Sequence, residues 1–545
     1  MNAILGVPRP LNAPVLPYGP GSGEKKLVKA TIGDLRALQP DIGLEIGGRQ
    51  IRTGNLGYCY APHDHKLRLA QYHQGGAQET QQAIDAALAA RKDWARTSLE
   101  DRTGIFLKAA ALLAGGWRPK LNAATMLSQS KNIFQAEIDA ACELIDFLNF
   151  NCFYAAWLYA GGLTDLISPP GFRNHLEFRP LEGFVFAVSP FNFTSIAGNL
   201  PTAPAIMGNT VVWKPAKTQI FSAYFLMQLF KEAGLPDGVI NMVFGPADVI
   251  SQVALDSPFL AGIHFTGSTE VFQGMCGRVG ANIAAGCYRT YPRLVGETGG
   301  KDFVMVHPSA NRRAVATGLI RGAFEYQGQK CSAASRGYVP ESMWQEVKEM
   351  MITDMGTMTM GTPENFTHFI NAVIDRPAFE RIKAQIEQAR AEGHEVIGGV
   401  CDDSNGYFIS PTLIIVKGPR ARTMVEEVFG PVLTVHVYPD HQYQETLELC
   451  NTTSPYALTG SIFSTDRAAI RLASNVLMDA AGNFYINDKP TGAVVGQQPF
   501  GGARGSGTND KAGSWLNLIR WASPRTTKET HEPPLDYRYT FMLEP

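Results

Sequence analysis

Four short segments combine side chains that can do chemistry with small or glycine-rich neighbours. They are residues 189–195 (SPFNFTS), 213–217 (WKPAK), 294–301 (LVGETGGK) and 327–335 (QGQKCSAAS). None of the four has a strong hydrophobic period, and binding and catalytic residues are concentrated in such irregular segments. An amide, an ammonium group, a carboxylate and a thiol are therefore the candidates for an active site.

The thiol and the carboxylate are suited to covalent and acid–base chemistry. Cys331 stands between Lys330 and Ser332 among small residues, which leave room for a substrate at the sulfur. Without a dedicated histidine it would need activation by local dipoles or by the charge of a cofactor. Glu297 stands among three glycines, where a dry pocket can raise its pKa into the range of a general base. An unreactive buried thiol and a solvated glutamate in a turn are the structural alternatives.

The amide and the ammonium group each follow a strand-like segment. Asn192 lies between two aromatic residues, and it can either cap a helix or donate a hydrogen bond to a developing oxyanion. Lys214 can meet a nucleotide or can simply be solvated. Gly267 and Ser268 open a helix, either as an ordinary cap or as a site for a pyrophosphate at the helix N–H groups. This segment lacks the G-x-G-x-x-G pattern of dinucleotide sites.

Short apolar runs alternate with amphipathic helices from about residue 176 to a helix that starts at about Ser268, which predicts a parallel sheet with crossover helices. Such sheets bind ligands at the carboxyl ends of their strands. A second β/α series is expected from Phe303 to Phe463. No residue from Gly183 to Trp213 is charged, but prolines and asparagines interrupt this run. We therefore expect a buried strand, a loop and a buried helix there, and no membrane span.

The composition excludes several classes of protein. The 545 residues carry a formal net charge of −2, without the basic surplus that would hold nucleic acid. The eight cysteines have no C-x-x-C or zinc-like spacing, so we expect reduced thiols and no metal site. The N-terminal segment has no secretory pattern, which favours the cytoplasm, or the mitochondrial matrix for a eukaryotic protein whose presequence was removed. We expect the Pro- and Gly-rich first fifty residues to form an irregular arm.

The order of the candidate residues along the chain is more specific than any one of them. Asn192, Lys214, Gly267, Glu297 and Cys331 are followed by Glu427 in the segment EEVFGP. This ordered set resembles the aldehyde dehydrogenase superfamily, from about Glu79 to Ala522. The resemblance implies that Cys331 attacks an aldehyde to give a thiohemiacetal and then a thioester. Asn192 and the backbone N–H of Cys331 would hold the oxyanion, and Glu297 would activate the water that hydrolyses the thioester.

The resemblance also implies a nicotinamide cofactor. Lys214 and Glu427 match residues that hold its riboses. NAD is the first choice, although Lys217 stands where NAD-preferring relatives often carry an acidic residue, and a lysine there can attract the 2′-phosphate of NADP. The other residues that match the nucleotide site are Ser189, Gly267, Ser268, Thr269, Glu270 and Val271.

Further motifs resemble the Δ1-pyrroline-5-carboxylate dehydrogenase branch of this superfamily, among them NFYINDKPTG at 483–492 and GQQPFGG at 496–502. Enzymes of this branch oxidise L-glutamate γ-semialdehyde to L-glutamate in proline catabolism. The resemblance implies that two aromatic rings clamp the aliphatic part of the substrate and that a serine and a glycine-containing loop bind its α-carboxylate. The matching residues are Phe193 and Phe500 for the clamp, and Ser332, Gly492 and Ala493 for the carboxylate.

Two positions qualify this match. Ala493 stands where some relatives carry serine, so one hydroxyl contact to the carboxylate would be lost while backbone contacts remain. Glu143 matches a residue that would reach the amino group of the substrate.

The implied architecture is the α/β aldehyde dehydrogenase fold, with a Rossmann-like cofactor domain, an α/β catalytic domain and a β-flap for oligomerisation. The cofactor domain would comprise residues 1–155 and 178–298, and the catalytic domain residues 299–495. The flap and tail would comprise residues 156–177 and 512–545, and the Gly- and Pro-punctuated segment 161–181 fits a hairpin. The implied partners are a small-molecule substrate and further copies of the chain in a homodimer or higher homo-oligomer.

Three alternatives stay open. The first is an aldehyde dehydrogenase of other substrate specificity, against which Ser332 and the 491–493 loop argue. The second is a CoA-acylating relative, which does not need the water-activating Glu297. The third is an inactive member with a structural role, which would be expected to have lost Cys331 or Glu297.

Overall fold

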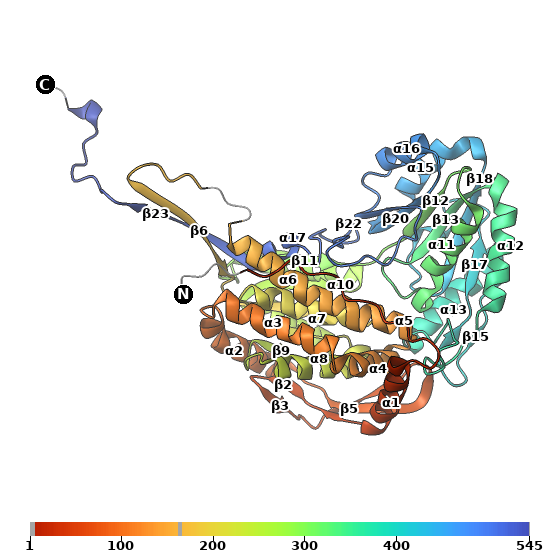
Figure 1. The fold of residues 1–545 in the computed structure, drawn as a ribbon, viewed down its shortest axis with the longest axis horizontal. Coiled ribbons are helices and arrows are strands. Elements are labelled where there is room, and N and C mark those ends of the chain that lie inside the picture. Colours follow the sequence, from red (N-terminus) through yellow and green to blue (C-terminus); the bar gives the residue numbers. More distant parts are fainter. Residues whose placement is uncertain (1–5, 162–165, 544–545) are drawn as a thin grey trace.

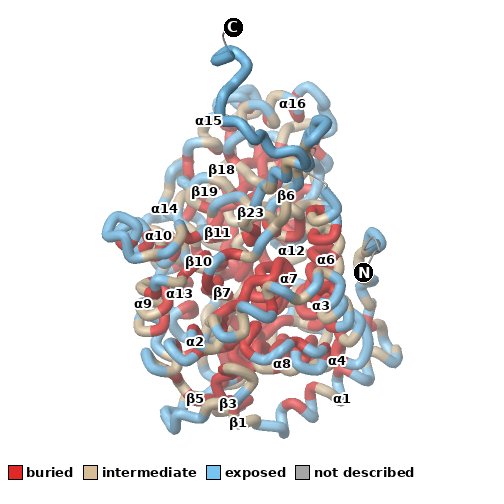
Figure 2. Tube along the Cα trace, turned by 90° about the vertical axis from the view of Figure 1, so that its left-hand side faces the viewer, coloured by how far each residue is buried: buried red, intermediate tan, exposed pale blue. Residues whose placement is uncertain are grey.

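Two seven-stranded sheets organise the chain, which the computed structural model describes over residues 6–161 and 166–543. The first sheet and its helices lie in the lower half of Figure 1, and the second sheet lies in the upper right. Buried residues run through the centre of both halves, between sheets and helices (Figure 2). Residues 1–5 of the predicted cofactor domain, 162–165 of the predicted flap and 544–545 of the predicted tail lie outside the described residues.

The first sheet has the strand order β11-β10-β7-β8-β9-β2-β3. The first five strands in this order are parallel to one another. They are β7 (Phe184–Val188), β8 (Thr210–Lys214), β9 (Ile240–Met242), β10 (Leu260–Thr266) and β11 (Arg293–Glu297). At the other edge β2 (Leu44–Ile46) and β3 (Arg49–Ile51) are antiparallel. The helices that alternate with the parallel strands are α7 (Thr194–Ile206), α8 (Ile220–Ala233), α9 (Ala247–Asp256) and α10 (Thr269–Ala284).

This topology confirms the predicted β/α alternation and the buried strand, loop and helix of residues 183–213. The chain moves outward from β7 to β9 and then returns to β10 on the other side of β7, so right-handed crossovers place α7 and α8 on one face of the sheet and α9 and α10 on the other. A switch of direction between β7 and β10 leaves a crevice at their carboxyl ends. Further helices complete the layers: α2 (Ala77–Trp94), α3 (Leu99–Ala114), α4 (Trp117–Gln129), α5 (Ile133–Ala136) and α6 (Leu144–Tyr159).

The second sheet has the strand order β14-β17-β18-β13-β12-β20-β21, and only its edge strand β14 is antiparallel. Separate apolar clusters fill its two sides. The strands are β12 (Asp302–Val306), β13 (Ala334–Pro340), β14 (Glu395–Gly398), β17 (Thr412–Ile415), β18 (Val432–Tyr438), β20 (Thr459–Phe463) and β21 (Asn483–Ile486). The helices are α11 (Arg312–Phe324), α12 (Glu341–Thr357), α13 (Arg376–Ala391), α14 (Arg422–Val425), α15 (Tyr443–Thr453) and α16 (Arg467–Val476).

The expectation of an irregular N-terminal arm was wrong beyond residue 22. Helix α1 (Gly23–Leu38) buries Val28, Ile32 and Leu35, and Ser22 caps it by accepting from the backbone N–H of Lys25. These apolar residues are spaced by four and three, which is the period of an amphipathic helix. Proline and glycine on either side obscured that period in the sequence. A small sheet of β1 (Asp41–Ile42), β4 (Leu56–Ala61) and β5 (Asp64–His73) follows.

The predicted flap is built differently from a local hairpin. Strand β6 (Phe172–Pro180) pairs along its whole length with β23 (Ala522–Thr530) from the C-terminal part of the chain. This two-stranded ribbon projects from the first half of the molecule, and the tail continues beyond it (Figure 1). The hairpin predicted within residues 161–181 was therefore wrong, because backbone pairing joined segments that are far apart in the sequence.

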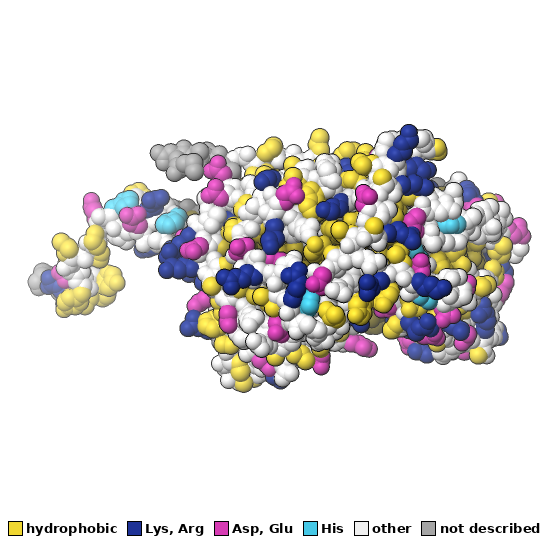
Figure 3. All heavy atoms as spheres, turned by 90° about the horizontal axis from the view of Figure 1, so that it is seen from below, with side chains coloured by type: hydrophobic (Ala, Val, Ile, Leu, Met, Phe, Trp, Pro, Cys, Tyr) yellow, Lys and Arg dark blue, Asp and Glu magenta, His cyan; other side chains and the backbone are white. Residues whose placement is uncertain are grey.

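The surface agrees with the balanced composition. Lys and Arg alternate with Asp and Glu over the face shown in Figure 3, and apolar side chains gather at the end of the tail. None of the helices in the described part of the chain combines the length and the apolar character needed to cross a bilayer. Within the same residues, no three His, Cys, Asp or Glu side chains are grouped closely enough to hold a metal ion.

A buried carboxylate holds the N-terminal segment against this core. Glu137 opens the π-helical turn η1 (Glu137–Glu143) and has no exposed surface. It accepts hydrogen bonds from the backbone N–H of Leu16 at 2.9 Å, the Tyr18 hydroxyl at 2.8 Å and the Asn122 amide at 2.7 Å. It also forms an ion pair with Arg118. Burial alone would raise the pKa of Glu137, but these partners outweigh it and lower the pKa below its ordinary value.

We expect Glu137→Ala to lower the free energy of unfolding by about 3–5 kcal/mol, because it leaves the buried guanidinium of Arg118 without its partner. Denaturant-induced unfolding measures this change. Asp256→Asn, which breaks the partly exposed pair with Arg278, serves as the control and should change stability by no more than about 1 kcal/mol. An equal effect of the two variants would contradict the role of the buried pair.

Candidate active site

Cys331 lies in a loop whose backbone conformation is unusual. The loop follows the 3-10 turn η3 (Glu325–Gly328) and leads into β13. Tyr326, Gln327 and Gly328 all have left-handed φ angles of 50°, 54° and 64°. Any side chain at residue 328 would meet the carbonyl oxygen of Gly430 at 2.0 Å, so only glycine fits. Such a run of left-handed residues persists only where the surroundings hold it.

Two glutamine side chains provide that support. The Gln327 amide donates to the carbonyl oxygens of Ser130 at 3.1 Å and Ala372 at 2.9 Å. The Gln329 side-chain oxygen accepts from the backbone N–H of Ile374 at 2.9 Å. All these contacts are buried. They tie the loop that carries Cys331 to the segment after α4 and to the segment before α13, so both halves of the molecule hold it.

Asn192 meets the same loop from the first sheet. It follows β7, is 4% exposed, and donates its side-chain N–H to the carbonyl oxygen of Gln329 at 3.0 Å. That carbonyl is two residues before Cys331. The structure therefore brings the predicted amide and the predicted thiol together.

Glu297 is the last residue of β11, at the carboxyl edge of the first sheet. Its carboxylate accepts from the backbone N–H of Gly502 at 3.1 Å, and a Cβ at Gly501 would lie 3.0 Å from its other oxygen. Burial raises the pKa of Glu297 well above its ordinary value; the Gly502 N–H and the charge of Lys511 oppose that rise. A neutral carboxylic acid at low pH can become a base as the pH rises.

Cys331 stands in a negative and poorly hydrated environment. Burial raises the pKa of the Cys331 thiol well above its ordinary value, and the nearby carboxylates of Asp302, Glu427 and Glu297 raise it further. The thiol is therefore protonated at neutral pH in the protein alone. A cation or an oriented dipole brought into this space would favour the thiolate.

Most of the predicted cofactor residues lie at the carboxyl ends of β7, β8 and β10 and at the start of α10. Ser268 caps α10 by accepting from the backbone N–H of Val271 at 3.3 Å. Thr269 accepts from the N–H of Gly299 at 3.2 Å, and the Gly267 N–H donates to the Glu297 carbonyl at 3.1 Å. The side chains of Ser268, Glu270 and Val271 are exposed at this helix start. Free backbone N–H groups at such a helix start suit a phosphate.

Ser189 directly follows β7, and Lys214 ends the adjacent strand β8. The backbone N–H of Ser189 donates to the Lys214 carbonyl at 3.2 Å. The Ser189 hydroxyl accepts from the Trp213 indole N–H at 3.0 Å, so its side chain has a structural contact of its own. Burial lowers the pKa of Lys214, and its ammonium group has no hydrogen-bond or ion-pair partner among the described residues. This unpartnered cation is suited to a polar ligand.

Glu427 reaches the same space from the second half of the molecule. One carboxylate oxygen accepts from the backbone N–H of Gly300 at 2.9 Å, and a Cβ at Gly299 would come within 2.6 Å of the other. Burial raises the pKa of Glu427 to about 7, against the opposing charges of Lys301 and Arg381. The segment from Glu297 to Gly300 thus leads from the carboxyl edge of the first sheet toward β12 of the second sheet.

The residues implied for substrate binding are connected to the segments that carry Cys331, Glu297 and Asn192. The Ser332 and Thr491 hydroxyls are hydrogen-bonded at 2.8 Å, which joins the nucleophile segment to the loop that carries Gly492 and Ala493. Gly492 has a φ of 97°, a conformation that favours glycine. Phe500 directly precedes the two glycines that contact Glu297, and its backbone pairs with Ala512. Phe193 directly follows Asn192.

A buried charge network beneath Phe193 was missed in the sequence, apart from Glu143. Lys131 forms an ion pair with Asp139 at 2.7 Å and places its ammonium group over the rings of Phe193 at 4.1 Å and Tyr326 at 4.4 Å. Asp139 also accepts from the backbone N–H groups at residues 194 and 195, at the start of α7.

Glu143 accepts from the Ser195 hydroxyl at 2.8 Å, and burial raises its pKa to about 8. Asp139 and Glu143 both lie on the π-helical turn η1, whose register cannot be read from a sequence period of 3.6.

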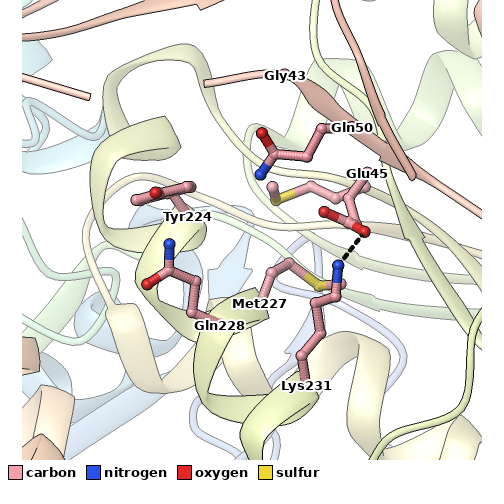
Figure 4. Close-up of a pocket in the computed structure, with 8 residues that line it drawn as sticks. Gly43, Glu45, Gln50, Tyr224, Met227, Gln228 and Lys231 are labelled. Carbon is pink, nitrogen blue, oxygen red and sulfur yellow. Dashed lines mark hydrogen bonds and ion pairs between the residues drawn. The ribbon is translucent and has the colours of Figure 1, made fainter. Parts of the chain in front are cut away.

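A cavity of about 270 Å³ lies apart from these residues. It is bordered by β2, β3, α8 and β9, and Figure 4 shows Glu45 and Lys231 across it, joined at 2.6 Å. None of the sequence-predicted site residues lines it.

We expect alkylation of Cys331 by iodoacetamide to be slow at neutral pH and to keep accelerating with pH beyond the range in which free cysteine levels off. The thiolate is the reactive form, and the raised pKa makes it scarce at neutral pH. Glu427→Gln removes one nearby negative charge, so the rate curve should shift to lower pH. Mass spectrometry of the peptide that contains Cys331 measures the rate. A rate that levels off below the range of free cysteine would contradict the raised pKa.

Comparison with known proteins agrees with this geometry. The model of the aldehyde dehydrogenase family matches residues 55–520. A Δ1-pyrroline-5-carboxylate dehydrogenase from Dictyostelium discoideum, named as mitochondrial, is 48% identical over 100% of this chain and 97% of its own length. The human protein of that name, also named as mitochondrial, is 46% identical over 97% of this chain and 94% of its own.

A solved structure of Δ1-pyrroline-5-carboxylate dehydrogenase from Mycobacterium tuberculosis bound with NAD is also similar. It has 50% sequence identity and a TM-score of 0.95, with all of both chains covered. The family match, these relatives and the shared fold lead to one conclusion: this chain belongs to the aldehyde dehydrogenase family.

Proposed function

We propose that this chain oxidises L-glutamate γ-semialdehyde, the open form of Δ1-pyrroline-5-carboxylate, to L-glutamate with NAD, as a step of proline catabolism. The observation that carries this proposal is the hydrogen bond between Ser332 and Thr491. It holds a glycine-containing loop, whose backbone N–H groups can bind a carboxylate, beside the segment of Cys331. The names of the relatives and of the similar solved structure support the same substrate.

The residues of this chain suit a two-stage reaction. Cys331 would attack the aldehyde carbon as a thiolate, and Asn192 and the Cys331 N–H would donate hydrogen bonds to the oxygen as it gains negative charge. NAD, when bound, supplies the acceptor for the hydride that leaves the aldehyde carbon. Glu297 would take a proton from water, whose oxygen attacks the thioester carbon and releases the acid and the Cys331 thiolate.

The nucleotide side of the site fits such a cofactor. Lys214 offers an unpartnered ammonium group, and Glu427 offers a carboxylate at the edge of the same space. The start of α10, from Gly267 to Val271, offers backbone N–H groups for a pyrophosphate. Lys217 is exposed just beyond β8, so NADP belongs among the cofactors to be tested.

We expect purified protein to reduce NAD in the presence of glutamate γ-semialdehyde, followed by the absorbance of NADH. Propionaldehyde, which has no carboxylate, should be a much poorer substrate, and Cys331→Ser should abolish turnover because the hydroxyl is a far weaker nucleophile. Turnover of propionaldehyde with equal efficiency would contradict the substrate. Reduction of NADP in place of NAD would contradict the cofactor.

Glu297→Gln should lower kcat by about 100- to 10,000-fold, the usual contribution of a general base, because the thioester can no longer be hydrolysed efficiently. A first turnover of NADH should persist in a rapid-mixing experiment. In the wild type, kcat should fall as the pH falls through the raised pKa of Glu297, since protonation removes the base. A pH-independent kcat, or the loss of the first turnover in Glu297→Gln, would contradict this role.

We also propose that the β6–β23 ribbon and the tail after it bind further copies of the chain in a homo-oligomer. The tail carries large apolar side chains that are almost fully exposed, with Leu535 at 100%, Tyr537 at 84% and Phe541 at 81%. Such a cluster at the end of a projecting ribbon is typical of an interaction surface.

The eight cysteines are free thiols, which suits a reducing compartment such as the cytoplasm or the mitochondrial matrix.

Replacing Leu535, Tyr537 and Phe541 together by serine should shift the protein to a smaller assembly, measured by analytical ultracentrifugation. Tyr291→Ser, which changes an apolar side chain that is 79% exposed elsewhere on the surface, is the matched control and should leave the assembly unchanged. A wild-type protein that sediments as a monomer would refute the proposal.

A further inference from the structure

A buried cluster of two lysines and one glutamate joins the two segments that meet at Ser332 and Thr491. Glu325, at the start of η3, accepts from the Lys330 ammonium group at 3.1 Å. Both of its oxygens accept from the Lys489 ammonium group, at 2.8 and 2.7 Å. The exposed fractions of the three side chains are 6%, 3% and 20%.

Each lysine belongs to a different part of the site. Lys330 directly precedes Cys331, and Lys489 lies two residues before Thr491. Lys489 also runs beside the loop itself, because a Cβ at Gly492 would be 3.6 Å from its Cε and 3.9 Å from its Nζ. Glu325 is therefore a bridge between the nucleophile segment and the carboxylate loop.

Helix α11 also packs against the segment that leads into the 491–493 loop. A Cβ at Gly322 would lie 3.4 Å from the ring of Pro490 and 3.5 Å from the Cβ of Lys489, so the chain rests directly on this glycine. Together with the bridge, this contact fixes the path of residues 489–491. A loop whose backbone N–H groups bind a ligand must be held in this way to lose little entropy on binding.

The cluster carries net positive charge. Burial works to raise the pKa of Glu325, but the charges of Lys330 and Lys489 outweigh it and leave the pKa below its ordinary value. Burial lowers the pKa of Lys330 to about 8, which keeps it mainly protonated at neutral pH. One carboxylate thus faces two ammonium groups, and the excess charge lies beside Gly492. The Lys489 side chain is 20% exposed, so water screens its charge less than it would screen a fully exposed one, and the charge acts more strongly on a nearby anion.

We propose that Lys489, held by Glu325, is a specificity-determining positioning residue that makes the site select aldehydes carrying a carboxylate. It sets the path of the 491–493 loop against the Cys331 segment and supplies positive charge behind the loop's backbone N–H groups. This inference deepens the proposed function and rests on it. Lys489 acts through the loop and leaves the chemistry at Cys331 to the residues described above.

The test compares Lys489→Met with Lys348→Met. Both changes keep an apolar stem and remove a lysine that pairs with one glutamate, and the side chains are similarly exposed, at 20% and 19%. In Lys489→Met, Glu325 keeps Lys330 as its partner, so no buried charge is left alone. We expect KM for glutamate γ-semialdehyde to rise about ten-fold, the size of one lost charge-assisted contact, with kcat little changed.

Propionaldehyde distinguishes loss of selectivity from general damage. The kcat/KM for propionaldehyde should stay within about two-fold of the wild type in Lys489→Met, because this aldehyde has no carboxylate for the loop to bind. Lys489→Arg, which keeps the charge, should retain most of the preference for glutamate γ-semialdehyde. Lys348→Met should behave as the wild type with both substrates.

A binding measurement that needs no turnover completes the test. The concentration of L-glutamate that half-protects Cys331 from alkylation should rise about ten-fold in Lys489→Met. Unchanged selectivity and protection in this variant, or an equal loss with both aldehydes, would overturn the inference alone. A wild type that does not oxidise glutamate γ-semialdehyde would overturn the proposed function and this inference with it.

Discussion

The loop that carries Cys331, residues 325–331, includes residues in left-handed backbone conformations, and much of the site depends on the contacts that hold this loop. Two non-glycine residues, Tyr326 and Gln327, lie in the left-handed region, where each costs about 1–3 kcal/mol. Gln327 and Asn192 donate hydrogen bonds and the Gln329 side chain accepts one, and these contacts offset that cost with partners from both halves of the molecule. The thiol is therefore placed by tertiary packing, and it exists in this position only when the two halves meet.

The position of the site between the two sheets also determines the pKa values of its ionisable groups. Residues 298–301 lead from the carboxyl end of β11 to the amino end of β12, so the site lies between the carboxyl edge of one sheet and the amino edge of the other. Glu297, Cys331 and Glu427 lie near one another there, and desolvation is the leading cause of all three raised pKa values. A bound cofactor or substrate changes the hydration and the charge near these groups, and so couples binding to the protonation of Glu297 and Cys331.

The buried carboxylates have a different use away from the reacting atoms. Glu137, Asp139 and Glu325 each accept from a buried cation, and Glu137 and Asp139 also accept from backbone N–H groups, so they fix distant segments to one another. Glu137 holds the N-terminal segment, and Asp139 holds the start of α7. Glu325 holds the segment of Cys331 against the loop of residues 491–493. Removing one of these carboxylates leaves its buried cation without a partner, which makes each carboxylate a specific constraint on the fold.

The sequence by itself determined the β/α alternation, the family and the set of chemical residues. Hydrophobic period and glycine placement are local properties, and the order Asn192, Glu297, Cys331 is a property of the chain alone. The roles of Glu427 and of the residues around Gly492 were predicted from the family resemblance. Their spacing in the sequence did not indicate these roles. Helix α1 was hidden by its Pro- and Gly-rich flanks, although its apolar spacing was present in the sequence.

Only the tertiary structure decided which of these groups meet. The pairing of β6 with β23, the π-helical register that aligns Asp139 with Glu143, and the Glu325 bridge to Lys330 and Lys489 each join residues through backbone pairing, helix register or burial. The raised pKa values follow from burial as well. A linear pattern records which residues are apolar or charged, but the loss of water around a charge depends on what packs against it in three dimensions.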